Sequence, residues 1–321
     1  MSSILRVIGT TKKYGGDLYE DELEAALQQQ HTVSTFNPVD PSLGKIAGLP
    51  KYIYNLKKIQ RLGMEFDYVL RPMNHTFFIG PEPKQVVIAY HFDTAYSHPL
   101  VKLHHSWGLQ SMISSRNNIH KIIVIAKYWQ EFYSGLGFKN IELLYCSFDL
   151  SQFEISDNEV DAFKERYQLH GKKVVYIGNA QKKKGADLVY EALKDTDYFL
   201  ITSGNSDIDL PVLNLKLKHR DYLCLMKAAG LVVTYSQFKE GWNRVAHEAM
   251  LLKTPVIGSG SGGMGELLAG GGQGICSNPA DLKKTVDLLY GNRDLGIQGY
   301  EFARQFTIEK FNAQALEIFK S

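Results

Sequence analysis

The sequence predicts an α/β protein with two doubly wound domains, each built on a parallel sheet that helices cover. The chain has 321 residues, 44% of them hydrophobic, which is enough for about two domains with buried cores. Short apolar runs alternate with helical segments, an order typical of parallel β-α-β units. The alternation stops at a polar stretch and starts again at Lys173. Two successive sets of this kind predict two domains.

The first set contains apolar runs that are short enough for buried parallel strands. These runs lie at residues 4–8, 33–36, 68–70, 86–90, 122–125 and 141–145. Helices are predicted between them, at residues 18–27, 52–62 and 99–117. The first strand, a polar loop ending in Gly15 and Gly16, and the helix after it form a β-loop-α start.

The second set repeats this pattern. Strands are predicted at residues 173–178, 198–202, 231–234 and 255–258, and helices at 186–193, 242–252 and 279–289. The expected junction is the polar stretch 151–171, which includes a charged helical segment at 159–167. The domains are therefore predicted at residues 1–168 and 169–303, and the amphipathic segment 304–321 is expected to pack back on the first domain.

Two facing domains of this kind leave a cleft between the carboxyl ends of their sheets. Ligands of open α/β sheets bind at those ends. We therefore expect the functional residues in the loops that follow the strands.

Composition excludes several classes of protein. The net charge is only +2, and no basic stripe is visible, so nucleic acid is not expected as a partner. Cys146, Cys224 and Cys276 lie far apart, without metal-binding spacing, which fits reduced thiols in a cytoplasmic protein. The apolar run at the amino terminus is too short for a signal peptide, and no run approaches a spanning helix.

One segment favours peripheral membrane association. Residues 51–61 form a basic amphipathic stretch with two tyrosines. Such a helix can lie on an anionic surface, which here would be the inner face of the membrane. The alternative interpretation is a helix beside the cleft with a solvated face.

The segment from Glu240 to Glu248 carries the main chemical signal. It follows a predicted strand and places one carboxylate before a helix and the other inside it. Asn243 is a plausible N-cap, and the free amides at a helix start attract anions such as a diphosphate. The alternative is an ordinary surface helix with an ion pair between Arg244 and Glu248.

This segment resembles the E-x7-E region of retaining glycosyltransferases of the two-Rossmann (GT-B) type, family four. The similarity continues through Glu248-Ala-Met-Leu-Leu-Lys-Thr-Pro-Val-Ile-Gly and reaches the Gly-Gly-x-x-Glu loop at residues 262–266. The resemblance implies two facing Rossmann-like domains, the first binding the acceptor and the second the donor. It also implies that Glu240 contacts the donor sugar, aided by Gly241, Trp242 and Asn243, while Glu248 holds the ribose.

A second motif follows the strand at 173–178. Gly178 ends the strand and Lys184 precedes a helix, so a cation and helix-start amides meet where phosphates bind. The segment resembles the family motif G-R-x(4,5)-K-G-x-D, with Lys184 at the lysine and Asn179 in place of the arginine. Lys182, Lys183 or Arg244 are hypothetical substitutes for that missing cation. The alternative for the lysines is a solvated loop.

Two further donor-site candidates lie in the first half. Gly16 lets the backbone approach a ligand closely, and its position is similar to the Gly-Gly loop of the family. His91 follows a predicted strand, at the place where the resemblance implies a histidine facing the donor sugar. A capping or packing role is the alternative for His91.

No metal is expected. The triplets Asp195-Thr-Asp197 and Asp207-Ile-Asp209 are short and common by chance, so we interpret them as turn residues. His98, His104 and His105 lie near His91, but their spacing matches no standard ligand pattern.

The predicted function is retaining transfer of a sugar from a nucleotide diphosphate sugar, UDP- or GDP-linked, without a metal or another cofactor. The acceptor would be a glycan, a small molecule or a lipid-linked sugar. Glu240, Lys184 and His91 are the predicted catalytic residues. A catalytically inactive binding subunit with the same fold is the first alternative, because of Asn179, and a phosphorylase is the second.

Overall fold

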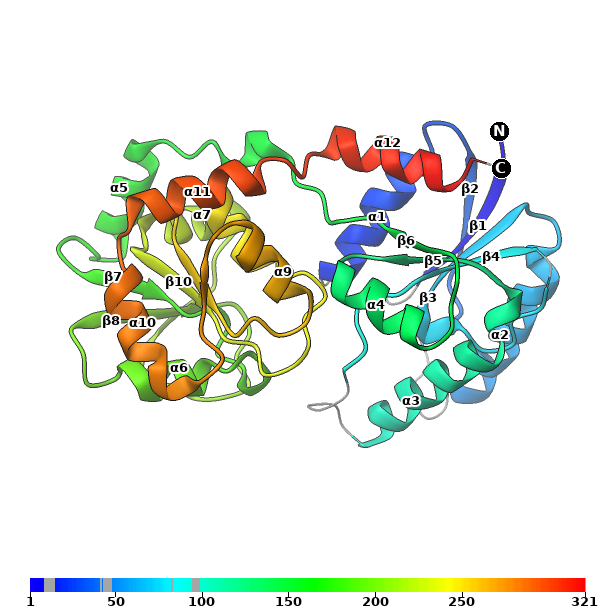
Figure 1. The fold of residues 1–321 in the computed structure, drawn as a ribbon, viewed down its shortest axis with the longest axis horizontal. Coiled ribbons are helices and arrows are strands. Elements are labelled where there is room, and N and C mark those ends of the chain that lie inside the picture. Colours follow the sequence, from blue (N-terminus) through cyan, green and yellow to red (C-terminus); the bar gives the residue numbers. More distant parts are fainter. Residues whose placement is uncertain (9–14, 41, 43–47, 82, 94–98, 321) are drawn as a thin grey trace. The chain divides into compact units, whose positions relative to one another are not determined.

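The computed structural model describes residues 1–8, 15–40, 42, 48–81, 83–93 and 99–320. The chain divides into two compact units (Figure 1). Unit 1 comprises Met1–Ser147 and Ile308–Ser321, and unit 2 comprises Phe148–Thr307. Each unit has its own parallel sheet, as the sequence predicted, and each sheet has six strands.

The sheet of unit 1 has the strand order β2-β1-β3-β4-β5-β6, with every neighbouring pair parallel. Its central strands are short apolar runs that are buried on both faces, which is the pattern of a helix-covered parallel sheet. The strands are β1 (Ser3–Val7), β2 (Thr32–Phe36), β3 (Tyr68–Pro72), β4 (Lys84–Ile88), β5 (Ile119–Val124) and β6 (Ile141–Leu143).

Helices cover both faces of this sheet (Figure 1). One face carries α1 (Gly15–Leu27) and α12 (Ile308–Ile318), and the other carries α2 (Leu49–Gly63), α3 (Pro99–Ser114) and α4 (Lys127–Gly135). Two short 3-10 turns, η1 (Met73–His75) and η2 (Arg116–Asn118), complete the unit.

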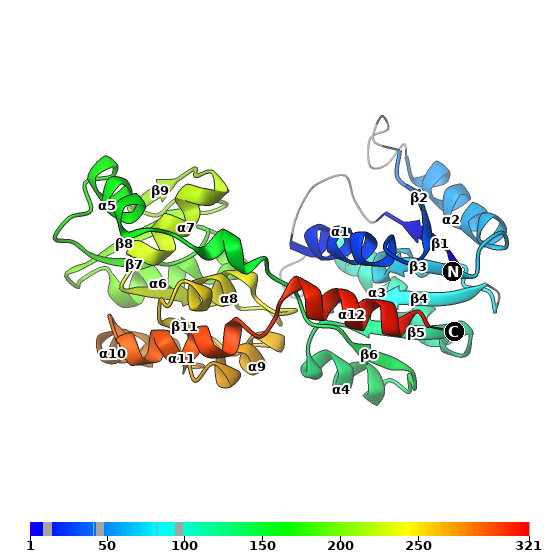
Figure 2. The same ribbon diagram turned by 90° about the horizontal axis from the view of Figure 1, so that it is seen from above.

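The last helix of the chain packs in unit 1. Helices α1 and α12 lie side by side (Figure 2), and the Phe311 ring meets the Tyr19 ring at a centroid distance of 5.5 Å. Just beyond α12, Phe319 packs edge-on against Tyr68 of β3 at 5.3 Å. This placement gives the apolar face of the helix the packing surface that its sequence pattern requires.

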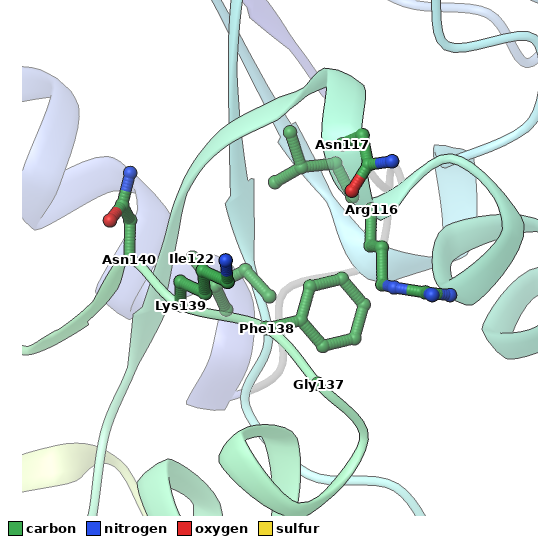
Figure 3. Close-up of a pocket in the computed structure, with 8 residues that line it drawn as sticks. Arg116, Asn117, Ile122, Gly137, Phe138, Lys139 and Asn140 are labelled. Carbon is green, nitrogen blue, oxygen red and sulfur yellow. The ribbon is translucent and has the colours of Figure 1, made fainter.

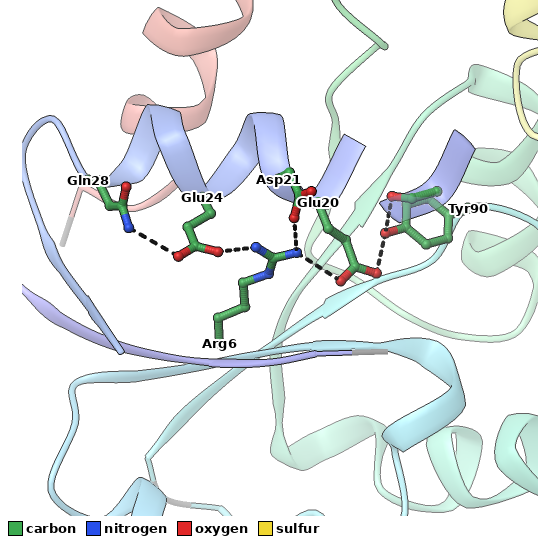
Figure 4. Close-up of polar contacts among 7 residues, drawn as sticks. Arg6, Glu20, Asp21, Glu24, Gln28 and Tyr90 are labelled. Carbon is green, nitrogen blue, oxygen red and sulfur yellow. Dashed lines mark hydrogen bonds and ion pairs between the residues drawn. The ribbon is translucent and has the colours of Figure 1, made fainter. Parts of the chain in front are cut away.

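A buried ion cluster ties β1 to α1 (Figure 4). Arg6 is only 4% exposed, and its guanidinium bonds to Glu24, to Asp21 at 2.9 Å and to Glu20 at 3.5 Å. Glu20 also accepts a 2.5 Å hydrogen bond from the hydroxyl of Tyr90, which follows β4. Burial raises the pKa of Glu20, against the opposing effects of Tyr90 and Arg6. The cluster therefore compensates a buried charge with several partners.

The sheet of unit 2 has the order β12-β11-β10-β7-β8-β9, again with parallel neighbours. The sequence predicted four of these strands and missed β9 and β12, whose three and two residues are too few to show a pattern. The strands are β7 (Lys173–Tyr176), β8 (Tyr198–Ser203), β9 (Leu213–Leu215), β10 (Leu231–Thr234), β11 (Val256–Gly258) and β12 (Gly274–Ile275).

Seven helices and three 3-10 turns flank this sheet within the described residues. The helices are α5 (Asp157–Arg166), α6 (Ala186–Leu193), α7 (His219–Ala228), α8 (Arg244–Leu251), α9 (Gly263–Gly270), α10 (Leu282–Leu289) and α11 (Arg293–Ala303). The turns are η3 (Leu150–Phe153), η4 (Lys182–Lys184) and η5 (Pro279–Asp281). Helices α4, α7, α9 and α11 were not predicted from the sequence.

The structure places the domain boundary between Ser147 and Phe148 instead of at residue 168. The polar stretch expected to be a junction contains α5, which is bound to unit 2 by charged contacts. Arg220 of α7 pairs with Glu159 at 2.7 Å, and Lys227 pairs with Asp157 at 3.1 Å. A solvated helix and a linker have similar polar composition, so the sequence pattern did not separate them.

In the part of the chain that is described, no helix combines the length and the apolar character needed to cross a membrane.

A buried histidine forms a second polar centre, in unit 2. His247 is fully buried on α8, accepts a 3.0 Å hydrogen bond from the Trp242 indole at Nδ1, and lies 3.0 Å from the carbonyl of Ala303 through Nε2. These partners assign the neutral tautomer with the proton on Nε2. The Phe148 ring stacks on the imidazole at 3.9 Å. Burial lowers the pKa of His247 to about 3.

The substitution His247→Phe should destabilise the protein at pH 7, because it leaves the Trp242 indole and the Ala303 carbonyl unpaired. The expected loss is about 2–4 kcal/mol. An imidazole whose pKa is lowered on folding destabilises the protein as pH falls below its unfolded value of 6.5, since only the unfolded chain binds the proton. The difference between wild type and variant should therefore shrink by about 2 kcal/mol at pH 5.

Urea unfolding at both pH values measures this effect. His170→Phe, at an exposed position, controls for the loss of an imidazole in general. An equal stability difference at pH 7 and pH 5 would show that His247 is not held neutral.

Candidate functional site

The sheet of unit 2 has its topological switch point between β7 and β10. These strands are neighbours, with Leu231 beside Val175, but the chain continues from β7 toward one edge and from β10 toward the other. The loops that leave their carboxyl ends therefore start out in opposite directions, and doubly wound sheets bind ligands at such a point. The first loop contains Lys184 and the second contains Glu240.

The structure brings these two predicted residues into contact. Lys184 Nζ lies 2.6 Å from Glu240 Oε1, and the Ser236 hydroxyl donates to the same oxygen at 2.5 Å. The Glu240 side chain is only 9% exposed, whereas that of Lys184 is 36% exposed. The carboxylate is therefore held in place by its partners, while the ammonium remains open to solvent.

Asn243 caps α8, as the sequence predicted. Its Oδ1 accepts a 2.9 Å hydrogen bond from the Ala246 amide, and its backbone is left-handed, with φ of 70°. Asparagine tolerates this conformation better than most residues. Its Nδ2 also lies 3.4 Å from Glu240 Oε1. The positive end of α8 is therefore fixed beside the Glu240 carboxylate.

A glycine loop after β11 holds the backbone of Glu240. The Glu240 amide donates to Ser261 O at 3.2 Å, and the Gly263 amide donates to Glu240 O at 2.9 Å. Gly262 has φ of 68°, and a Cβ there would lie 2.5 Å from Glu240 O. Only glycine fits this close approach, which explains the Gly-Gly pair of the motif.

Glu248, the second carboxylate of the pair, lies on α8 and is 9% exposed. Its Oε2 accepts a 3.1 Å hydrogen bond from the Tyr222 hydroxyl, and Arg244 Nε lies 4.0 Å from its Oε1. Burial raises the pKa of Glu248 to about 7, although Arg244 and Tyr222 act in the opposite direction. This carboxyl group therefore titrates near neutral pH.

Trp242 has a different role from the one expected for its side chain. It was predicted in the donor site, but its side chain is buried, with the residue 2% exposed, and its indole N–H donates to His247. The ring also packs on Phe306 at 5.4 Å. Trp242 therefore anchors the Glu240 loop to the core, and Gly241 beside it is buried as well.

The loop after β7 is joined to the loop after β10 through backbone groups. Gln237 donates from its amide to Lys183 O at 3.0 Å and from its side chain to Lys182 O at 2.8 Å. Gly178 has φ of 72°, and the Asn179 amide lies close to Gly204. The side chains of Lys182 and Lys183 are exposed.

Both Asp-x-Asp triplets have local structural partners. Asp207 accepts a 2.8 Å hydrogen bond from the Lys182 amide, at the start of η4, and Asp197 pairs with Lys173 at 2.6 Å. These contacts fit turn residues. Across the described ranges, no group of three or more His, Cys, Asp or Glu residues is arranged to hold a metal ion.

Gly16 and His91 lie in unit 1. The Tyr90 ring packs against Gly16, where a Cβ would lie 3.4 Å from the ring, and the Tyr90 hydroxyl donates to Gly16 O at 3.2 Å. His91 is exposed and lines a cavity of about 80 Å³ together with His105 and Asp93. His98, another histidine considered from the sequence, lies outside the described residues.

A larger cavity of about 230 Å³ lies in unit 1, near the amino ends of β5 and β6 (Figure 3). Because ligands of parallel sheets bind at the opposite, carboxyl ends, this cavity does not belong to the candidate site. It is lined by Arg116, Asn117, Ile119, Ile122, Gly137, Phe138, Lys139 and Asn140.

Comparison with known proteins agrees with this geometry. Residues 157–298 match the family model described as "Glycosyl transferases group 1". A protein described as an uncharacterized glycosyltransferase of Methanocaldococcus jannaschii is 28% identical over an alignment of 156 residues that covers 42% of this chain. The matched part spans 44% of the length of that relative.

Solved structures show similarity over almost the whole chain. Anabaena HepE in complex with UDP and glucose is 17% identical, with a TM-score of 0.77 and 99% of each chain covered. Sucrose-phosphate synthase from Thermosynechococcus elongatus is 16% identical, with a TM-score of 0.80, covering 99% of this chain and 98% of that one. At such low identity the likeness shows the fold. Residues 157–298 are thus similar to the group 1 glycosyltransferases, and the two parallel six-stranded sheets have the GT-B architecture.

Proposed function

We propose that this protein is a retaining glycosyltransferase that moves a sugar from a nucleotide diphosphate sugar to an acceptor. The observation that carries the proposal is the contact of Lys184 with Glu240 at the β7–β10 switch point, beside the capped start of α8. A cation, a carboxylate and helix-start amides at one point fit a diphosphate joined to a sugar. The complexes of HepE with UDP-glucose support a UDP-sugar as the donor.

Each of these residues binds a different part of the donor. Glu248 accepts hydrogen bonds from the ribose hydroxyls, and Glu240 accepts them from hydroxyls of the transferred sugar. Lys184 stabilises the diphosphate with amides of the Gly178, Gly241 and Asn243 segments. Because Lys184 and Glu240 are paired with each other at 2.6 Å, donor binding has to replace this contact. The diphosphate then becomes the partner of the cation, and the sugar hydroxyls become partners of the carboxylate.

In the proposed reaction the bond from the anomeric carbon to the phosphate oxygen breaks while the acceptor oxygen attacks the same face. The electron pair leaves with the diphosphate, whose charge Lys184 and the amides stabilise. The acceptor proton passes to the leaving phosphate oxygen. This route needs no carboxylate nucleophile. From the family resemblance, His91 is predicted to contact the donor sugar and Gly16 to approach the donor through its backbone; both remain predictions.

Asn179 supplies no charge where the family motif has arginine. Lys182 and Lys183 are exposed on the same loop and are our candidates for the second cation. If they do not compensate, the protein binds the donor without turning it over. This is the second candidate function, a binding subunit, and Asn179 is the observation that favours it.

Replacement of the catalytic carboxylate gives the first test. Glu240→Gln should lower the rate of UDP release from UDP-glucose by at least about 100-fold, because the neutral amide loses the charge that meets the sugar hydroxyls. Circular dichroism and thermal unfolding should show an intact fold. Glu191→Gln, at an exposed surface ion pair, is the control. Unchanged turnover in Glu240→Gln would contradict the assignment, and binding of UDP-glucose without turnover by the wild type would favour the binding subunit.

The raised pKa of Glu248 predicts a pH-dependent donor affinity. Ribose hydroxyls donate to the ionised carboxylate, so binding should strengthen as pH rises through the folded pKa of about 7. Such a group is about 10% ionised at pH 6 and about 90% at pH 8, so affinity for UDP-glucose should increase nearly tenfold. Titration calorimetry at both pH values measures this. Glu248→Gln should bind weakly at either pH, and the same pH dependence in this variant would assign it to another group.

We also propose a cytoplasmic protein that meets a sugar or glycolipid acceptor at the inner membrane face. Helix α2 buries Leu56 and Ile59 but leaves Ile53 41% and Tyr54 67% exposed, with lysines beside them. The three cysteines are buried and form no disulfide with one another, which fits a reducing compartment.

This surface predicts salt-sensitive binding to vesicles that contain phosphatidylglycerol. Reversing the charge of Lys57 and Lys58 to Glu should reduce co-sedimentation several-fold, since basic residues supply much of the attraction to anionic lipid. The matched control reverses Lys283 and Lys284 of α10. Equal loss of binding in both double variants would contradict a specific role for α2.

A further inference from the structure

One buried cation in unit 1 has no counter-ion among the described residues. Arg71, the fourth residue of β3, is 1% exposed. Its Nη1 donates to the carbonyl of His75 at 3.1 Å, but Nε and Nη2 are buried and have no hydrogen-bond partner in the described part of the chain. Burial lowers the pKa of Arg71 to about 10, so the guanidinium keeps its charge at neutral pH. A buried charge without an anion is strongly unfavourable.

Arg6 on the neighbouring strand β1 is also a buried arginine, but it has counter-ions. Its guanidinium, 4% exposed, meets three carboxylates of α1. The two arginines lie on opposite faces of the sheet, because Arg6 is beside Leu70 in the strand register and side chains alternate along a strand. The α1 carboxylates therefore serve Arg6 and not Arg71.

The other acidic side chains offer no substitute. Within the described ranges no carboxylate affects the pKa of Arg71, for which burial is the cause. Outside those ranges the sequence has one acidic side chain, Glu82, two positions before β4 begins at Lys84. Lys84 lies beside Tyr68 at the start of β3, whereas Arg71 is beside Val87 near the ends of both strands. We therefore expect a bound ligand to supply the counter-ion of Arg71.

The free donors have the geometry of an oxyanion site. Nε–H and Nη2–H share one edge of the guanidinium and point in parallel, which matches two oxygens of a phosphate or carboxylate. Arg71 also lies at the carboxyl edge of the sheet, on a strand at its switch point, where the order reverses between β1 and β3. The turn η1, to which it is bonded, contributes Met73 and Asn74 to the cavity that His91 lines.

We propose that Arg71 binds an oxyanion of the acceptor, so that the acceptor of this enzyme carries a phosphate or carboxylate group. This inference rests on the proposed function, because only a transferase has an acceptor. The anionic character of the bound group is inferred separately, from the unpaired edge of Arg71. Arg71 is a binding residue and takes no part in the transfer itself. The anion accepts hydrogen bonds from the two free donors, Nε–H and Nη2–H, and neutralises the buried charge.

Thermal unfolding at increasing concentrations of inorganic phosphate tests the site. Phosphate replaces chloride, so that the ionic strength stays constant. The proteins are wild type, Arg71→Met and Lys184→Met. Methionine is long and flexible enough to fill the space of the arginine chain. Because it removes an uncompensated charge, Arg71→Met should unfold at the same or a higher temperature than wild type without phosphate.

Phosphate should stabilise wild type and Lys184→Met at the Arg71 site, and its apparent affinity should fall at least about tenfold in Arg71→Met. Lys184→Met separates this effect from phosphate bound in the donor site. Acetate in place of phosphate distinguishes a carboxylate from a phosphate, and glycerol 1-phosphate against phosphatidic acid vesicles distinguishes a soluble from a lipid-linked source.

A lower unfolding temperature of Arg71→Met with an unchanged phosphate response would overturn the proposal, since Arg71 would then be a structural residue. Arg71→Lys, which keeps the charge but loses the parallel donors, should bind phosphate more weakly than wild type; equal binding also contradicts the site. UDP-glucose should stabilise wild type and Arg71→Met equally. Absence of that effect in both would count against the donor function and leave the anion result intact.

Discussion

The site in unit 2 depends on the ion pair between Lys184 and Glu240, which joins the two loops at the switch point. An isolated carboxylate that is only 9% exposed would be costly, and Lys184, Ser236 and Asn243 together compensate it. Every one of these partners donates toward the same oxygen. The pair therefore links the loop after β7 to the loop after β10, and in the proposed function the same groups bind the sugar donor. In the proposed function, donor binding exchanges these partners and does not assemble a new site.

Two features of the fold keep that carboxylate in position. The Gly262 loop holds the backbone of Glu240 from one side, and Trp242 ties the following residues to His247 from the other. His247 is a rigid anchor because both ring nitrogens have partners and its neutral form is strongly favoured. A site held this way loses little free energy to reorganisation when charge develops on a ligand. In the proposed function, the surrounding core acts through Glu240 and does not itself contact substrate.

Buried ionisable groups of this protein are accommodated in three different ways. Arg6 is surrounded by the carboxylates of α1 and holds that helix on the sheet, whereas Arg71 has only a carbonyl partner among the described residues. Glu248 shows a third solution, since its raised pKa lets the group become neutral when no ligand is present. An arginine does not have this option near neutral pH. The uncompensated charge of Arg71 is therefore a stronger indication of anion binding than the raised pKa of Glu248 is of ligand binding.

The sequence by itself determined the repeated β-α pattern, the parallel sheets and the segments that carry Lys184, Glu240 and Glu248, because strand and helix periods and helix caps are local properties. It did not show the short edge strands β9 and β12, or that α5 belongs to unit 2. Tertiary structure alone decided that Lys184 meets Glu240, 56 positions away, that Trp242 packs inward and that Arg71 has no counter-ion in the described part of the chain. These facts depend on burial and on through-space neighbours, which exist only after the strands have taken their order in the sheet.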